Sequence, residues 1–325
     1  MSNISLWQLI GFLIALYAVI GNDSLQTLGT YLESNKDKTS KINQILFICA
    51  ITTAILFYGW AQNQAGAGYG DPAWGRLKEF AVPQDYNWVY IIPPISVLFL
   101  TQLGAPVSTS FIILTTFSIE NSWTLLISSL TGYAISLCIS IVTYGAGKWI
   151  DQTKLYVQEN EQIKTTNNWQ VLQWISTSLL WSQWLVLDAA NIFIYLPRDL
   201  NLAWMSSATG LFCVGICILV SRGGGPIQDI VKNKTDTENI RSATIIDLVY
   251  GIVLFITAKI TSFPLSTTCI FLGLLAGREI GLRLWLDNEN NSIPFKLLAN
   301  DLIKVLLGII VSLIIAISLQ PVLQI

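Results

Sequence analysis

The chain has 325 residues, of which 53% are hydrophobic and only 12% are charged, and its mean hydropathy is +0.57. Because soluble domains usually carry about 25% charged residues, this chain lacks the polar side chains that would cover a soluble fold, and membrane lipid must form part of its solvent. The net charge of -2 and the pI near 5.2 indicate no basic surface for nucleic acid. The chain contains no His, which excludes imidazole metal ligands and His proton relays.

The apolar residues occur in long runs, and about 20 mostly apolar residues are enough for a helix that crosses a membrane. The runs lie at 5–32, 43–62, 88–118, 122–143, 170–197, 203–221, 243–286 and 298–320. Two of them, 88–118 and 243–286, are long enough to hold two helices, and each has a Pro-containing break inside it. The pattern predicts an all-α polytopic membrane protein in which these two segments form helical hairpins.

The order of these elements repeats along the chain. In each half a helix with a polar break, at Gly21–Asp23 or Asp188–Asn191, is followed by a second helix, a loop, a hairpin and a last helix. We expect a membrane repeat at 1–147, a cytoplasmic linker at 148–169 and a second membrane repeat at 170–325. Each repeat crosses the membrane three times if its hairpin is re-entrant and five times if both arms span. Because both numbers are odd, the two repeats are inverted, a design found in many secondary transporters.

The loop charges predict the sidedness of the chain. When the odd crossings are followed from the N-terminus, 13 of 16 loop Lys and Arg residues fall on the side opposite the termini. Only Arg76, Lys78 and Arg198 fall with the termini. Since Lys and Arg are enriched in cytoplasmic loops, we expect a cell-membrane protein with both termini extracytoplasmic. The Gly-rich segment 63–87 is expected to be a flexible external loop.

Both hairpin breaks carry a Pro-x-Ser-Thr turn, at 106–109 and 264–267. Pro ends the first arm because it removes a hydrogen-bond donor and disfavours helix before it, and the Ser/Thr run then opens the second arm. Unpaired N–H groups at a helix start, with hydroxyls beside them, can hold an oxyanion. Two such turns from inverted repeats could enclose one tetrahedral anion; the alternative is that the hydroxyls only cap these helices. The candidate anion-binding residues are Ser108, Thr109, Ser110, Ser266, Thr267 and Thr268.

The polar breaks place a carboxylate and an amide on one helix face in each repeat. Asp23 and Gln26 are three residues apart and share a face, and Asp188 has the same spacing from Asn191. An Asp inside a membrane is costly and usually faces a cavity or an ion path, and carboxylate and amide oxygens are ligands for hard cations such as Na⁺. With Asn22, these residues form the candidate cation site. The alternative places both carboxylates in water at the membrane edge.

These motifs resemble those of the PiT family of inorganic phosphate transporters. That family has a G-A-N-D-V-A-N-A type motif near the start of each half and a P-V-S-T-T-H type motif in each hairpin. Here the first type is seen at 21–26 and 187–191, and the second at 106–111 and 264–269, in the family's order and bracketing nearly the whole chain. The family's Asn, Asn, Thr, His and His are replaced here by Gln26, Leu187, Ser110, Phe111 and Cys269.

The resemblance implies cation-coupled uptake of phosphate, with the anion held by the hairpin tips and Na⁺ or H⁺ held by the Asp and Asn residues. It also implies a place in the cation site for Asp247, which stands where the family has a Glu early in the second hairpin. The missing His favours Na⁺ over H⁺, and no cofactor is expected besides the transported cation. The predicted function is Na⁺-coupled phosphate symport.

Other functions are compatible with parts of this pattern. A symporter for another oxyanion such as sulfate would use the same hydroxyls, and an uncoupled anion channel would need no cation site. We expect no enzyme activity, because no nucleophile–base pair and no metal-ligand cluster is present in the sequence. The expected partners are phosphate or a similar oxyanion and membrane lipid, not nucleic acid, and a homodimer is left open. Lys259, near the second tip, either adds positive charge close to the anion, or it snorkels to the interface or pairs with an Asp.

Overall fold

The structure is a computed structural model that describes most of the chain. The described residues are 4–66, 68–83, 86–102, 107–118, 120–151, 167–223, 240–260 and 265–286, together with 303, 310, 311, 313–315 and 317–319. Pro106 and Pro264 of the hairpin turns lie outside these residues, as does most of the predicted linker at 148–169 and of the last predicted helix. The boundaries of the two repeats therefore stay a prediction.

The first repeat follows the predicted order of elements. Its first helix, α1 (Leu6–Val19), starts at a capping box in which Ser5 and Gln8 each bond the other's backbone N–H. It continues through a π-helical turn, η1 (Ile20–Ser24), into α2 (Leu25–Ser34). The remaining elements are α3 (Lys41–Gln62), β1 (Gln64–Gly66), β2 (Tyr69–Gly70), η2 (Arg76–Glu79), η3 (Trp88–Ile91), α4 (Ile92–Gln102), α5 (Thr109–Phe117) and α6 (Ser122–Asp151).

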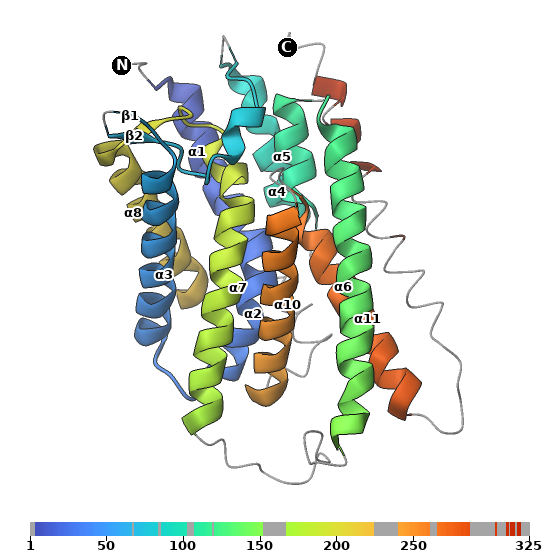
Figure 1. Ribbon diagram of the computed structural model, residues 1–325. Helices are drawn as coiled ribbons and strands as arrows, with labels where there is room; N and C mark the ends of the chain where they lie inside the picture. The colour runs from blue at the N-terminus through green and yellow to red at the C-terminus, as the bar shows by residue number, and fades with distance from the viewer. Residues whose placement is uncertain are drawn as a thin grey trace.

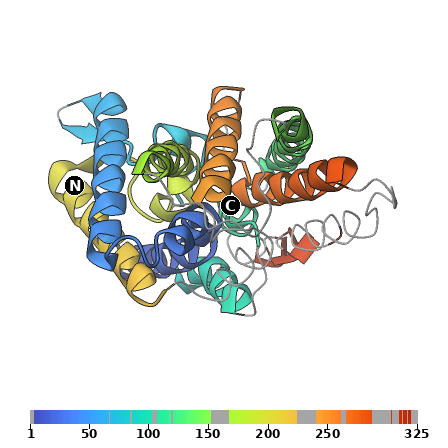
Figure 2. The same ribbon diagram turned by 90° about the horizontal axis from the view of Figure 1, so that it is seen from below.

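The second repeat begins with the helix at the centre of the molecule. Its described elements are α7 (Asn167–Phe193), β3 (Leu200–Asn201), α8 (Leu202–Ser221), α10 (Ile240–Ile260) and α11 (Thr267–Leu286). Figures 1 and 2 show α7 in the middle of the bundle, between α3 and α10. Trp181 and Trp184 of α7 are fully buried and stacked, with ring centroids 4.6 Å apart. The core of the fold is thus built around α7.

Membrane crossing is supported by the length and apolarity of the helices. Among the described residues, the stretches that could span a membrane are Leu6–Ser24, Lys41–Gln62, Ser122–Gly145, Leu202–Ser221 and Ile240–Lys259. Apolar side chains on their outer faces are exposed, such as Ile42 on α3 and Val142 on α6, each 68% exposed, as contact with lipid requires. The chain is an all-α polytopic membrane protein, as predicted.

The two hairpins enter the bundle from opposite sides. α4 has 11 residues and α5 has 9, which span about 16 and 14 Å, about half of the roughly 30 Å hydrocarbon layer. Even with η3 included, the described first arm, Trp88–Gln102, is shorter than the about 20 residues of a full span, so the lengths favour the re-entrant alternative for that repeat, which stays a prediction. In Figure 1, α4 and α5 occupy the upper half of the bundle, whereas α10 and α11 reach the same level from below. The repeats thus have the inverted arrangement that the sequence predicts.

The predicted break in the first helix of each repeat is found in the first repeat only. In the first repeat the break is the π-helical turn η1, which holds Asn22 and Asp23 without ending the helix; single π turns of this kind occur often at functional sites. In the second repeat α7 runs through Asp188 and Asn191 and ends at Phe193. The break expected at Asp188–Asn191 is therefore wrong: the backbone stays helical, and the polar side chains of Asp188 and Asn191 bond to hairpin hydroxyls.

The expectation of a flexible loop at 63–87 is wrong for residues 70–80, most of which are buried in a packed cap, whereas the described residues among 64–69 are exposed as expected of an external loop. β2 pairs with β1 and with β3 of the second repeat, and Trp60 Nε1 donates to the carbonyl of Leu200 at 2.7 Å. A Cβ at Gly70 would lie 2.3 Å from the Trp60 carbonyl, so the strand approaches too closely for any other residue. Arg198 then holds the end of the cap through the carbonyls of Phe80 and Ala81.

Glycines set the position of α11 against α6. A Cβ at Gly273 would lie 2.3 Å from Ser136 Oγ and 2.5 Å from the carbonyl of Tyr133. A Cβ at Gly277 would lie 2.4 Å from the carbonyl of Leu137. Small residues four apart let two membrane helices approach this closely. The contact fixes the position of α11 along the axis of α6, and therefore the position of the first turn of α11, which follows the second hairpin tip.

Candidate functional site

The predicted site residues of both repeats meet where the hairpin tips reach η1, α2 and α7. Eleven of the twelve predicted residues converge there, and Asp247 does not. Asp23 is 1% exposed and Asp188 is fully buried. Their burial contradicts the alternative that the two carboxylates lie in water at the membrane edge. Whether these residues bind ions stays a prediction.

Each buried carboxylate accepts a hydrogen bond from the threonine of its own repeat's hairpin. Thr109 Oγ1 donates to Asp23 Oδ2 at 2.5 Å, and Thr267 Oγ1 donates to Asp188 Oδ2 at 2.5 Å. The second oxygen of Asp23 accepts from an amide, Asn22 Nδ2, at 3.0 Å. The second oxygen of Asp188 accepts from the amide of Asn191 at 3.1 Å. The threonine partners of the two carboxylates thus correspond, whereas the amide partners do not, because Leu187 stands at the position equivalent to Asn22.

A second pair of contacts crosses between the repeats. Gln26 Nε2 on α2 donates to Thr268 Oγ1 of the second hairpin at 3.4 Å. Asn191 Nδ2 on α7 donates to Ser110 Oγ of the first hairpin at 3.0 Å. Gln26 and Asn191 each stand three residues after an Asp, and Thr268 and Ser110 each stand two residues after the Ser of their turn. The same contact is therefore made twice by corresponding residues.

The two tips also touch each other directly. The hydroxyl of Thr268 donates to the carbonyl of Val107 at 3.2 Å. In the corresponding contact, the hydroxyl of Ser110 lies 3.4 Å from the carbonyl of Leu265, and it lies equally far from Asp188 Oδ1. Val107 and Leu265 hold equal positions in their turns. The site thus has an approximate two-fold relation, which an inverted duplication would produce.

Ser108 and Ser266 cap the second arms of their hairpins. Ser108 Oγ accepts from the backbone N–H of Phe111 at 3.3 Å, and Ser266 Oγ accepts from that of Cys269 at 3.2 Å. For these two side chains the capping alternative describes the geometry. The hydroxyls that bond to the carboxylates and amides are those of Thr109, Ser110, Thr267 and Thr268.

Three amide oxygens in the site lack a hydrogen-bond partner among the described residues. They are Asn22 Oδ1, Gln26 Oε1 and Asn191 Oδ1, and all are buried. A buried acceptor left unpaired costs about 1–3 kcal/mol, so positive charge placed beside these oxygens would be stabilised. Together with the two carboxylates they form a set of oxygen donors suited to a hard cation such as Na⁺.

Asp247 lies in a separate buried site. Its carboxylate accepts from Thr30 on α2 and from Thr177 on α7, the latter at 2.5 Å. Thr177 precedes Asp188 by 11 residues on the same helix, which corresponds to about 16 Å along its axis. The structure therefore does not bring Asp247 to the hairpin tips, where the sequence analysis grouped it with the other cation-binding candidates.

Sequence analysis missed the place of Arg76, which it treated as a loop charge. Arg76 lies in the packed cap and is 6% exposed. Burial lowers the pKa of its guanidinium to about 10, and the charge of Asp188 acts in the opposite direction, so Arg76 is protonated at neutral pH. A single Arg after Trp74 and Gly75 gives no signal of burial, because the pairing of the cap with the second repeat depends on distant residues.

Comparisons with known proteins show the fold. No protein-family model matches the chain, and no curated protein matches it. Among solved structures, the chain is similar to one described as "The sodium-dependent phosphate transporter", with a TM-score of 0.63, 98% of each chain covered and 13% sequence identity. At this identity the likeness extends to the fold, and the two chains share it over nearly their whole length.

Proposed function

We propose that the chain is a cation-coupled symporter of inorganic phosphate and a divergent member of the PiT family, with Na⁺ as the coupling ion. The observation that carries the proposal is the paired contact of Thr109 with Asp23 and Thr267 with Asp188. It joins the predicted anion-binding and cation-binding residues in one buried site. The structural neighbour is described as a sodium-dependent phosphate transporter, which supports the same substrate and ion.

The cation is held by oxygens of both repeats. Asp23 and Asp188 supply negative charge, and the unpartnered amide oxygens of Asn22, Gln26 and Asn191 complete the donor set. A proton would need only one carboxylate oxygen, whereas a set of several oxygen donors matches the coordination of a metal cation. The amide oxygens therefore favour Na⁺ over H⁺.

Competition for the carboxylates would couple the cation to the anion. Without a cation, the hydroxyls of Thr109 and Thr267 donate to Asp23 and Asp188, and two buried negative charges would repel phosphate. A Na⁺ bound to the carboxylates neutralises this charge and takes the lone pairs that the hydroxyls use. The hydroxyls can then rotate and donate to a phosphate oxygen. The cation binds first in this scheme, and the anion affinity depends on it.

Inverted repeats that meet at the site suit alternating access. In such proteins one repeat rocks against the other around a site near the midplane. The contacts between the tips, Thr268 to Val107 and Ser110 to Leu265, would separate and re-form during such a movement. We place the protein in the cell membrane with both termini outside, as the loop charges predict.

Uptake into proteoliposomes tests the proposed function. The full chain would be reconstituted, and uptake of labelled phosphate and labelled sulfate measured with an inward Na⁺ gradient, with choline in place of Na⁺, and with a pH gradient alone. We expect phosphate uptake driven by the Na⁺ gradient. Uptake of sulfate in preference to phosphate would assign another oxyanion, and uptake indifferent to every gradient would indicate a channel. Uptake driven by the pH gradient alone would make H⁺ the coupling ion.

A further inference from the structure

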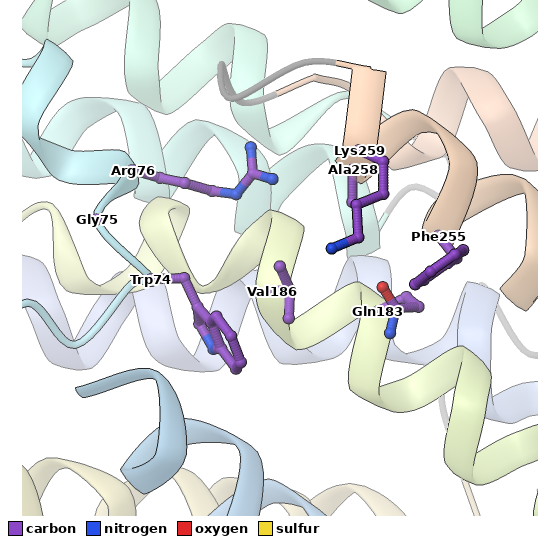
Figure 3. A pocket seen from close by; sticks show the side chains of 8 residues that line it. All are labelled: Trp74, Gly75, Arg76, Gln183, Val186, Phe255, Ala258 and Lys259. Carbon is purple, nitrogen blue, oxygen red and sulfur yellow. The ribbon is translucent and has the colours of Figure 1, made fainter. Parts of the chain in front are cut away.

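A cavity close to the end of α10 has two positively charged side chains, Arg76 and Lys259, in its lining. It has a volume of about 400 Å³ and lies between the cap, α7 and α10. Its lining includes Arg76 from the cap, Gln183 and Val186 from α7, and Phe255 and Lys259 from α10. Figure 3 shows the guanidinium of Arg76 and the ammonium of Lys259 directed into the same space above Val186, from opposite sides. None of the eight lining residues is acidic.

The surroundings of the two cations explain why they can stay there. Lys259 Nζ lies 5.6 Å from the ring centroid of Phe255, a distance at which an aromatic ring attracts a cation. Arg76 is held at the start of η2 and is 6% exposed. Two cations that face one space repel each other, and an anion between them reduces that repulsion. The cavity is thus electropositive and shaped to receive an anion.

The cavity lies close to the level of Asp188 along α7, on another face of that helix. Gln183 and Val186 precede Asp188 by five and two residues on α7, so the cavity runs along the turns of α7 just before Asp188. The charge of Asp188 also acts on Arg76. An anion held by Arg76 would therefore lie on the cap side of the carboxylate site and within its electrostatic reach.

We propose that this cavity is an outer subsite in which Arg76 and Lys259 bind a phosphate group before it reaches the hairpin tips. Arg offers a planar pair of N–H donors that fits two phosphate oxygens, and Lys adds a point charge. The inference rests on the proposed function, because the subsite takes the same substrate. The phosphate group is that of free inorganic phosphate; a phospholipid head group carries the same chemistry and is distinguished by the experiment.

Thiol labelling at Ala258 tests the subsite without transport. Ala258 lines the cavity, so Ala258→Cys, with the five native cysteines replaced by Ala, reports on the cavity while keeping both cations. The labelling ratio is the rate with the anionic reagent sulfonatoethyl methanethiosulfonate divided by the rate with its cationic trimethylammonium analogue. In lipid-free detergent, we expect this ratio to be about tenfold higher with Lys259 present than after Lys259→Met. Millimolar inorganic phosphate should slow the reaction. Arg76→Met should lower the labelling ratio in the same way as Lys259→Met. If Arg76→Met does not fold, Lys259→Met decides the test, because Lys259 is exposed and its replacement should not prevent folding.

The matched control is Lys78→Met, which removes the same charge from an exposed position of the cap, two residues from Arg76. It should leave the labelling ratio and the protection by phosphate unchanged. Protection only by added phosphatidic acid, and not by inorganic phosphate, would overturn the proposal in favour of a lipid head group. A labelling ratio equal in Lys259→Met and Lys78→Met would overturn it altogether.

Transport separates this inference from the proposed function. In proteoliposomes Lys259→Met should raise the KM for phosphate about tenfold or more, as expected for the loss of one charged contact, with kcat little changed. If the wild type takes up no phosphate, the proposed function fails. If the wild type takes up phosphate while Lys259→Met keeps its KM and Ala258→Cys is not protected, the subsite alone fails.

Discussion

Replacing the site threonines by valine separates anion binding from cation binding. Thr109→Val and Thr267→Val keep the shape of the side chain and remove the hydroxyl that donates to Asp23 Oδ2 or Asp188 Oδ2 at 2.5 Å. A hydrogen bond to a charged group contributes about 1.5–3 kcal/mol. Without Na⁺, each variant leaves a buried carboxylate oxygen with one donor fewer, so its melting temperature in detergent should fall. With Na⁺ the cation takes the place of the lost donor, and the difference from wild type should shrink.

Phosphate affinity is the second measurement on these variants. If the hydroxyls turn to the anion once Na⁺ is bound, each substitution removes about 1.5–3 kcal/mol of binding, and phosphate affinity should fall about 10- to 100-fold. Na⁺ affinity should be kept or rise, because the competitor for the carboxylate is gone. Because the two positions correspond in the two repeats, the two variants should behave alike. Isothermal titration of the purified protein with phosphate, at saturating Na⁺, measures the effect.

The control for both variants is Thr116→Val. Thr116 is buried on α5, and its hydroxyl bonds the carbonyl of Ile112 within the same helix at 2.8 Å. Its loss should leave phosphate affinity unchanged in Na⁺. Folded Thr109→Val and Thr267→Val proteins with the phosphate affinity of Thr116→Val would refute the coupling scheme.

Three further predictions follow from the site, the packing and the topology. Asp188→Asn should lower Na⁺ affinity by up to about a thousandfold, because a unit charge about 4 Å from the ion contributes about 4 kcal/mol. Phosphate affinity should fall with it. If phosphate binding by the variant keeps its full dependence on Na⁺, Asp188 is not part of the coupling site. Gly273→Val should destabilise the protein by about 1–3 kcal/mol or more, because its Cβ meets Ser136 Oγ at 2.3 Å; an unchanged melting temperature would contradict the close packing of α6 and α11. A cysteine added at the C-terminus should be labelled from outside intact cells and one at Asn160 should not, and the reverse pattern would contradict the predicted sidedness.

Much of the site could be predicted because its parts are local in sequence. The turns at Val107 and Leu265 and the Asp23 and Asp188 segments each carry their chemistry within a few residues, and each occurs twice. Duplication then indicates that the four segments converge. The structure adds how they converge: the Asp–Thr pairs lie within a repeat, whereas the amide of Gln26 crosses to the other.

The features that could not be predicted depend on distant partners. Asp247 is satisfied by Thr30, 217 residues away, and by Thr177, 70 residues away, so its place apart from the tips has no local signal. The packed cap depends on pairing between β2 and β3 of different repeats. The close contact of α6 and α11 was not predicted either: Gly273 and Gly277 have the four-residue spacing of helix-packing glycines, but this spacing does not identify the partner helix.

The mutual effect of Na⁺ and phosphate on each other's binding tests the central claim most directly. Binding of labelled phosphate to the purified protein would be measured across Na⁺ concentrations at constant ionic strength, with choline as the balance, and binding of labelled Na⁺ across phosphate concentrations. If both ions share the site formed by the two tips, each should raise the affinity of the other by the same factor. A phosphate affinity that is equal in Na⁺ and in choline would contradict the account.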